Sequence, residues 1–143
     1  MTHRPEVLVA CRKNAGRSVA GRLLVQHYGA GRLVVTSAGS EPGTEVHPEV
    51  RTVLAERGLD VSHEFPKPLT NAAVQQADVV VTMGCGEACP IYPGKRYEDW
   101  PVDDPAGQVA ETVRAIVDDI DVRARALVSE LLPGHVLPDA PHR

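Results

Sequence analysis

A cysteine followed six positions later by an arginine lies in the segment that constrains this chain most, Cys11–Ser18. The segment follows the apolar run Val7–Ala10, so the pattern predicts a buried strand, a short loop and the start of a helix. Backbone N–H groups of such a loop and the N-terminus of the helix can surround a tetrahedral oxyanion, and the guanidinium of Arg17 can bind two of its oxygens. The segment therefore predicts an oxyanion site.

Cys11 begins this loop and is our candidate nucleophile. Positive charge and backbone donors around a thiol favour the reactive thiolate, and the Ser18 hydroxyl is placed to donate a hydrogen bond to the sulfur. The alternative is a structural cysteine, because free cysteine is among the most often buried residue types. The anion site is favoured, since the preceding strand, the small residues Ala15 and Gly16 and the hydroxyl all fit it.

The other residues of the loop are expected to shape the site. The expected oxyanion-binding residues are Arg12, Lys13, Asn14, Ala15, Gly16, Arg17 and Ser18. Asn14 is expected to hold the loop open through hydrogen bonds to neighbouring backbone. Two interpretations stay open for Arg12 and Lys13: their side chains point outward into solvent, or they widen the positive field that captures the anion.

Strands that alternate with helices predict an α/β fold, a single domain with an open, parallel four-stranded sheet and helices on both faces. The expected strands are residues 6–10, 33–36, 77–83 and 95–100, and the expected helices are residues 17–28, 48–57, 71–76 and 109–132. We assign residues 1–132 to the domain and the Pro-rich, aperiodic residues 133–143 to a flexible tail. Ligands bind beyond the carboxyl ends of strands in such sheets, so Cys11, Cys85 and Asp104 are expected on one rim.

Composition and motifs argue against several classes of protein. The net charge of −4 provides no basic surface for nucleic acid or an anionic membrane. No apolar run approaches the ~20 residues of a membrane span, and no signal-peptide segment precedes the first strand. The three cysteines do not suit a secreted disulfide framework, and the histidines lack zinc-ligand spacing. We expect a cytoplasmic monomer without a cofactor or a metal.

Four further segments carry a family resemblance together with the loop: Ser37–Gly39, Val79–Cys85, Cys89–Pro90 and Asp103–Gly107. In this order they make the chain resemble the low-molecular-weight protein tyrosine phosphatases. The resemblance is stronger to the arsenate-reductase branch, whose loop commonly reads Cys-x-x-Asn-x-x-Arg-Ser. It extends from about Val7 to Leu131 and implies a low-molecular-weight phosphatase-like fold.

The resemblance implies two chemistries that begin with attack of Cys11 on a bound oxyanion. A phosphatase hydrolyses phosphomonoesters through a phosphocysteine at Cys11. An arsenate reductase uses Cys85 to attack the Cys11 sulfur and expel arsenite, and Cys89 then takes over the disulfide for reduction by thioredoxin. The Cys85–Cys89 pair favours a thioredoxin-coupled reductase over a reductase that uses a small thiol such as mycothiol or glutathione. Two incidental cysteines, or two metal ligands, are the alternatives for this pair.

Asp104 matches the position of the general acid in the family, where it would protonate the leaving group. A loop end without a catalytic role is the alternative. In tyrosine-specific relatives aromatic residues usually follow this position, whereas Ala106 and Gly107 follow here, which favours a small inorganic oxyanion. The leading hypothesis is thus a thioredoxin-coupled arsenate reductase with residual phosphatase activity. A phosphatase and a module that only binds or senses an oxyanion are the competing hypotheses.

Two departures from the family concern the surroundings of the loop. Some relatives bind potassium there through carboxylates, but the corresponding positions here are Arg22 and Lys67. Two cations cannot hold potassium, so we expect no alkali-metal site, with Arg22 or Lys67 bracing the loop instead. Ser37 is expected to join the hydrogen bonds of the loop, as its counterpart does in relatives.

Overall fold

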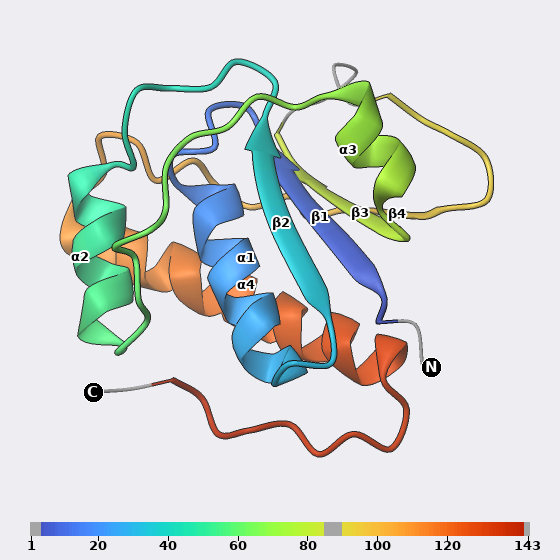
Figure 1. The fold of residues 1–143 in the computed structure, drawn as a ribbon. Helices are drawn as coiled ribbons and strands as arrows, with labels where there is room; N and C mark the ends of the chain where they lie inside the picture. Colours follow the sequence, from blue (N-terminus) through green and yellow to red (C-terminus); the bar gives the residue numbers. More distant parts are fainter. Residues whose placement is uncertain (1–3, 85–89, 142–143) are drawn as a thin grey trace.

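A parallel sheet of four strands forms the centre of the computed structural model, which describes residues 4–84 and 90–141 (Figure 1). The strands are β1 (Glu6–Cys11), β2 (Val34–Gly39), β3 (Val79–Met83) and β4 (Arg96–Asp99). They lie side by side in the order β2-β1-β3-β4, and every pair is parallel. The expected open, parallel four-stranded sheet is confirmed.

Helices cover both faces of this sheet. They are α1 (Arg17–Gly29), α2 (Pro48–Glu56), α3 (Asn71–Gln76) and α4 (Ala110–Leu131). Helices α1, α2 and α4 lie on one face, and α3 lies on the other (Figure 1). Most boundaries agree with the sequence-based ones to within two residues, the usual uncertainty at element ends.

Strand β2 is the exception, since it continues through residues 37–39, which we expected to close it. Each of these residues pairs with β1, and the last pair joins Gly39 to Cys11. A Cβ on Gly39 would lie 2.8 Å from both the Arg12 carbonyl oxygen and the Asn14 nitrogen. The loop after β1 therefore passes directly over the end of β2, where only glycine leaves room for it.

Alternate residues of β1 supply two separate cores. Val7 and Val9 pack in the main core with α1, α2 and α4. Leu8 and Ala10 pack in a smaller core that includes Val74 of α3. Because both faces of the strand are covered, its sequence is apolar without alternation.

The connections of the sheet place a ligand site at the end of β1. The chain leaves β1 toward β2 and leaves β3 toward β4, in opposite directions, although β1 and β3 are neighbours. In open α/β sheets ligands bind beyond the carboxyl ends of strands at such a point. Cys11 is the last residue of β1, so the loop that follows it lies at this point.

Residues 133–141 contain no helix or strand, but specific contacts hold them beside α1. A ring nitrogen of His135 lies 2.9 Å from the Tyr28 carbonyl oxygen, and one of His27 lies 2.7 Å from the Asp139 carbonyl oxygen. Leu137 packs against the main core. The domain boundary at residue 132 and the flexibility of the tail stay predictions. None of the described helices is long and apolar enough to cross a membrane.

Candidate active site

Cys11 is buried beneath the loop that follows β1. Its Sγ lies 3.0 Å from Ser18 Oγ and accepts a hydrogen bond from the Asn14 backbone N–H, with 3.3 Å between nitrogen and sulfur. Asn14 Nδ2 donates to Ser18 Oγ at 2.6 Å. Because the Ser18 oxygen accepts from Asn14, its own proton is available for the sulfur. Donors from the backbone and from a side chain thus converge on Sγ and stabilise negative charge there.

Asn14 fixes the shape of the loop. Its backbone adopts a left-handed conformation with φ of 51°, which asparagine tolerates better than most residues. Its side chain is fully buried, and Oδ1 accepts a hydrogen bond of 2.8 Å from the Lys67 backbone N–H. Asn14 therefore ties the loop to the chain segment between α2 and α3.

The backbone of the loop is oriented by the segment after β2. The carbonyl oxygens of Arg12, Lys13 and Ala15 accept hydrogen bonds from N–H groups of residues 41, 43 and 47, at 2.7 to 2.9 Å. The C=O and N–H of one peptide unit point in opposite directions. The N–H groups of residues 13, 14 and 16 therefore point to the opposite side, where that of residue 14 reaches the sulfur.

Arg17 is the first residue of α1 and reaches across the carboxyl end of the sheet. Its Nη1 donates to the Val102 carbonyl oxygen at 3.3 Å, and its Nη2 lies 3.7 Å from Asp104 Oδ2. A Cβ on Gly84 would lie only 2.6 Å from Nη1, so the bare backbone after β3 makes room for the guanidinium. The Asp104 side chain is 58% exposed, which leaves this carboxyl accessible from solvent. Arg17 and Asp104 are thus close enough to act on one bound group.

A cavity of about 160 Å³ contains these groups. Its lining residues are Cys11, Lys13, Gly16, Arg17, His47, Asp104 and Ala106. The volume is below the ~300–1,000 Å³ of sites for drug-sized ligands, so the cavity suits a small anion. His47 was not expected at the site from the sequence, although a histidine directly before the proline that begins α2 was a visible signal.

Arg12 and Lys13 differ in position, so one interpretation applies to each: a side chain directed to solvent, or a positive charge beside the anion site. Arg12 donates from Nε to Glu41 Oε2 at 2.8 Å on the exposed surface, and its guanidinium lowers the pKa of Glu41. Lys13 Nζ lies 3.8 Å from the same oxygen, but Lys13 also lines the cavity. Arg12 therefore points outward, while Lys13 adds positive charge to the mouth of the site.

A family model described as low molecular weight phosphotyrosine protein phosphatase matches residues 6–134. The chain belongs to this family. Curated relatives include a putative arsenate reductase of Halobacterium salinarum, 34% identical over 128 residues that cover 86% of this chain and 90% of the relative. They also include a glutaredoxin arsenate reductase of Synechocystis, 31% identical over 129 residues, covering 88% of this chain and 98% of the relative.

Solved structures of this family share the fold. A thioredoxin-dependent arsenate reductase of Corynebacterium glutamicum is 44% identical, with a TM-score of 0.79. The match covers 89% of this chain but only 61% of that one, so this chain spans about three fifths of that relative. Wzb of Vibrio vulnificus, solved with benzylphosphonate, is 25% identical, with a TM-score of 0.79 over 90% of this chain and 99% of the other.

Two of the expected catalytic residues, Cys85 and Cys89, lie outside the described residues. The description ends at Gly84, directly after β3, and resumes at Pro90. The last residue of β3, Met83, pairs with Cys11 in the sheet. The chain segment that leads to Cys85 therefore leaves the sheet beside the nucleophile.

Ser37 does not take part in the hydrogen bonds of the loop as we expected. It is buried, yet its hydroxyl has no hydrogen-bond partner among the described residues. Ser37 pairs with Val9 in the sheet, two residues before Cys11. The Asn14 amide already bonds Ser18 and Lys67, so the side-chain network of the loop is completed without Ser37.

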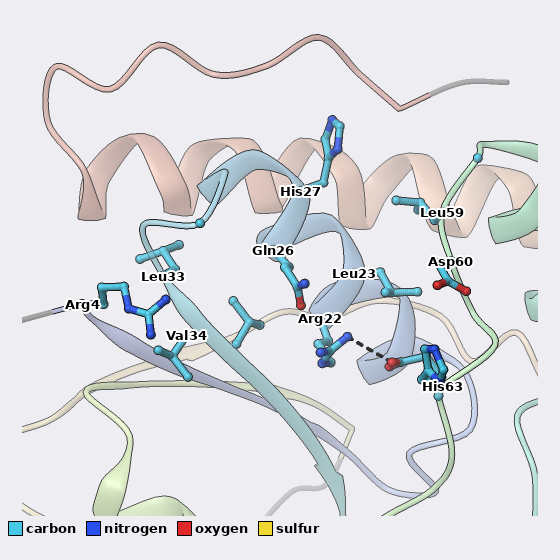
Figure 2. Close-up of a pocket in the computed structure, with 14 residues that line it drawn as sticks. Arg4, Arg22, Leu23, Gln26, His27, Leu33, Val34, Leu59, Asp60 and His63 are labelled. Atoms are coloured by element: carbon cyan, nitrogen blue, oxygen red, sulfur yellow. Dashed lines mark hydrogen bonds and ion pairs between the residues drawn. The ribbon is translucent and has the colours of Figure 1, made fainter.

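Neither cation that we placed beside the loop braces it through its charge. Arg22 Nη1 donates to Glu64 Oε2 at 3.0 Å and forms an ion pair with this residue of the segment after α2, not with the loop (Figure 2). Lys67 supports the loop only through its backbone N–H to Asn14, and its Nζ donates to the Phe65 carbonyl oxygen at 3.0 Å. Burial lowers the pKa of Lys67. Within residues 4–84 and 90–141, no three metal-ligating side chains form a cluster.

A second cavity is larger than the one at Cys11 but lies elsewhere. It measures about 660 Å³ and is lined by residues of α1, the start of β2 and the segment after α2 (Figure 2). Arg22, His27 and His63 are among its lining residues, and Cys11 is not. Because Cys11, the candidate nucleophile, and residues of the loop line the smaller cavity, it is the candidate active site.

Proposed function

We propose that this protein reduces arsenate to arsenite, with Cys11 as the nucleophile. The observation that carries the proposal is the shared cavity of Cys11, Arg17 and Asp104, whose volume of about 160 Å³ accommodates a small anion. Hydrogen-bond donors converge on the Cys11 sulfur, and Arg17 lines the same cavity. The printed names of the relatives from Halobacterium, Synechocystis and Corynebacterium support arsenate as the anion.

The first step forms a bond between sulfur and arsenic. Arsenate binds with its oxygens to the N–H groups of the loop and to Arg17. The Cys11 thiolate attacks the arsenic, an As–O bond breaks, and the departing hydroxide takes a proton from Asp104 and leaves as water. Arsenic stays pentavalent in this step. The 3.7 Å between the Arg17 and Asp104 side chains supports their action on the same group.

The second step transfers two electrons to arsenic. The Cys85 thiolate attacks the Cys11 sulfur, a disulfide forms, and the electron pair of the S–As bond stays on arsenic, which leaves as trivalent arsenite. The Cys89 thiolate then attacks Cys85, so that a Cys85–Cys89 disulfide forms and Cys11 is released as a thiolate. A dithiol of thioredoxin reduces this disulfide. These roles rest on the sequence and on the Corynebacterium relative, which is thioredoxin-dependent.

A phosphatase is the second candidate function, and the same cavity favours it. Phosphate and arsenate have the same tetrahedral shape, so the loop binds both, and phosphocysteine formation at Cys11 needs no further thiol. The Vibrio relative was solved with benzylphosphonate, a phosphonate that carries a phenyl ring on its CH2 group. Ala106 lines the cavity where an aromatic wall would hold a phenyl ring, so we propose only residual phosphatase activity. A cytoplasmic monomer stays our expectation.

The deciding experiment couples arsenate to NADPH oxidation through thioredoxin and thioredoxin reductase. We expect steady turnover by the wild type, a loss of multiple turnover in Cys89→Ser, and no activity in Cys11→Ser. A parallel assay with glutaredoxin and glutathione tests the other reductant, which the Synechocystis relative suggests. Hydrolysis of an aryl phosphate without arsenate turnover by either reductant would show a phosphatase instead.

A further inference from the structure

We propose that His47 binds the oxyanion, as a second side-chain donor beside Arg17. The inference rests on the proposed function, because it concerns the same anion in the same cavity. His47 comes from neither the loop nor the family-like segments of the sequence. Tertiary structure alone brings it to the cavity that Cys11 and Arg17 line.

The main chain of His47 is fixed against the loop. Its backbone N–H donates to the Ala15 carbonyl oxygen at 2.8 Å, and its own carbonyl oxygen accepts from the Arg51 N–H at 3.0 Å in the first turn of α2. A Cβ on Gly16 would lie 3.3 Å from Cδ2 of the His47 ring. The ring therefore packs against the residue directly before Arg17 and is held on the wall of the cavity.

The imidazole of His47 makes no hydrogen bond to any other described residue. His47 occupies the N-cap position of α2, but its side chain makes no capping hydrogen bond. Within residues 4–84 and 90–141, its ring nitrogens have no hydrogen-bond partner, although the residue is half-buried. A neutral imidazole always carries one N–H donor, and an imidazolium carries two. A donor without a partner on the wall of an anion cavity is suited to bind the anion.

The charges that face the same cavity support this role. Lys13 and Arg17 are cationic, and Asp104 is the one carboxyl that lines the cavity among the described residues. A neutral or positive imidazole adds to the binding of an anion without a further negative charge. Because arsenate and phosphate are both tetrahedral oxyanions, a hydrogen bond from His47 strengthens the binding of both.

The test measures the affinity for inorganic phosphate in four proteins. Protection of Cys11 from iodoacetamide, followed by mass spectrometry of its peptide, reports phosphate binding without any relay cysteine. His47→Phe keeps a ring of similar shape without a donor, and His47→Gln keeps an N–H donor. His63→Phe is the matched control, because His63 lines only the other, larger cavity.

We expect Kd for phosphate to rise about tenfold in His47→Phe, the effect of losing one hydrogen bond to a charged group. His47→Gln should recover part of this loss, and His63→Phe should bind as the wild type does. An unchanged Kd in His47→Phe would overturn the proposal. An equal loss in the Phe and Gln variants, with a lower Tm in both, would assign the ring to packing and also overturn it.

Arsenate kinetics separate this proposal from the proposed function. We expect the KM for arsenate to rise about tenfold in His47→Phe while kcat changes less, since the contact is present before and during the reaction. Turnover with an unchanged KM in this variant would overturn only the role of His47. Phosphate binding that depends on His47 in a protein that never reduces arsenate would overturn only the proposed reaction.

Discussion

The two cavities of this protein teach that the chemistry of the lining residues identifies a candidate site better than the size of the cavity does. In the larger cavity, Arg22 pairs with Glu64, a ring nitrogen of His27 meets a carbonyl oxygen, and hydrogen bonds from Ser62 lower the pKa of Asp60. The cavity at Cys11 is about a quarter of that volume, 160 against 660 Å³. Its lining residues include Cys11, Arg17 and Asp104, together with His47, whose ring nitrogens have no hydrogen-bond partner among the described residues.

The largest expected effect is on kcat/KM for arsenate, and it should distinguish two arginines of helix α1 that line different cavities. In Arg17→Lys we expect kcat/KM for arsenate to fall about 100-fold or more, because an ammonium cannot bind two oxygens as a planar guanidinium does. Arg22→Lys should stay within about twofold, since Arg22 faces the other cavity. The coupled thioredoxin assay measures both. Similar losses in the two variants would contradict the assignment of the site.

The next effect concerns Gly84, which makes room for Arg17. In Gly84→Ala the new Cβ would overlap Arg17 Nη1, and a guanidinium displaced by about 1 Å should weaken phosphate binding by 10- to 100-fold. Gly94→Ala is the matched control: φ is +83° there and +85° at Gly84, but the Gly94 Cβ would contact nothing within 4 Å. Both variants carry the strain of alanine at positive φ, so a comparable loss of binding in Gly94→Ala would contradict this explanation.

The Arg22–Glu64 pair of the larger cavity should affect stability, not catalysis. The Glu64 side chain is only 7% exposed, so Arg22→Leu leaves a buried carboxylate without its cation. We expect the free energy of unfolding in urea to fall by about 2 kcal/mol. Arg12→Leu breaks an exposed pair with Glu41 and should leave the free energy of unfolding nearly unchanged. Equal costs would mean that burial does not distinguish the two pairs.

The smallest effect appears at alkaline pH, in a third group of paired side chains. Burial and a hydrogen bond to Asp121 raise the pKa of Tyr28 to about 12. The folded protein thus keeps the phenol proton longer than the unfolded chain, whose tyrosine has an ordinary pKa of ~10. This stabilisation is complete below pH ~10 and is lost as the pH rises to about 12.

Urea unfolding at several pH values tests this sign. The wild type should lose stability more steeply between pH ~10 and ~12 than Tyr28→Phe, which has no phenol proton to release. Tyr97→Phe serves as the control for the general alkaline loss. A slope that is the same in all three proteins would contradict the role of Tyr28.

Much of the fold was predictable because its signals are local. The apolar run before Cys11, the helical spacing along α4 and the apolar residues of β3 each lie within one element. The end of β2 was not predictable in this way. Residues 37–39 continue the strand only because β1 supplies partners to each of them. Pairing between segments separated in sequence has no signature in either segment alone.

The candidate site divides in the same manner. Cys11, Asn14, Arg17 and Ser18 lie in one continuous segment, and the structure shows their side chains or backbone around one sulfur or one cavity. The expected hydrogen bond from Ser37 to the loop was wrong. Ser37 pairs with Val9, two residues before Cys11, and its hydroxyl has no hydrogen-bond partner among the described residues. Arg22 was misjudged as well, since its partner Glu64 is 42 residues away along the chain.

The sequence by itself determined the parallel α/β sheet and predicted an anion-binding loop that begins with a cysteine nucleophile. A strand, a loop and a helix start in consecutive residues suffice for that conclusion. Only the tertiary structure brought His47 from the start of α2 to the cavity that Cys11 lines and placed Gly84 against the Arg17 guanidinium. The parallel direction of the strands brings their carboxyl ends to one edge, and the strand order decides which ends are neighbours. That order depends on packing across the whole chain.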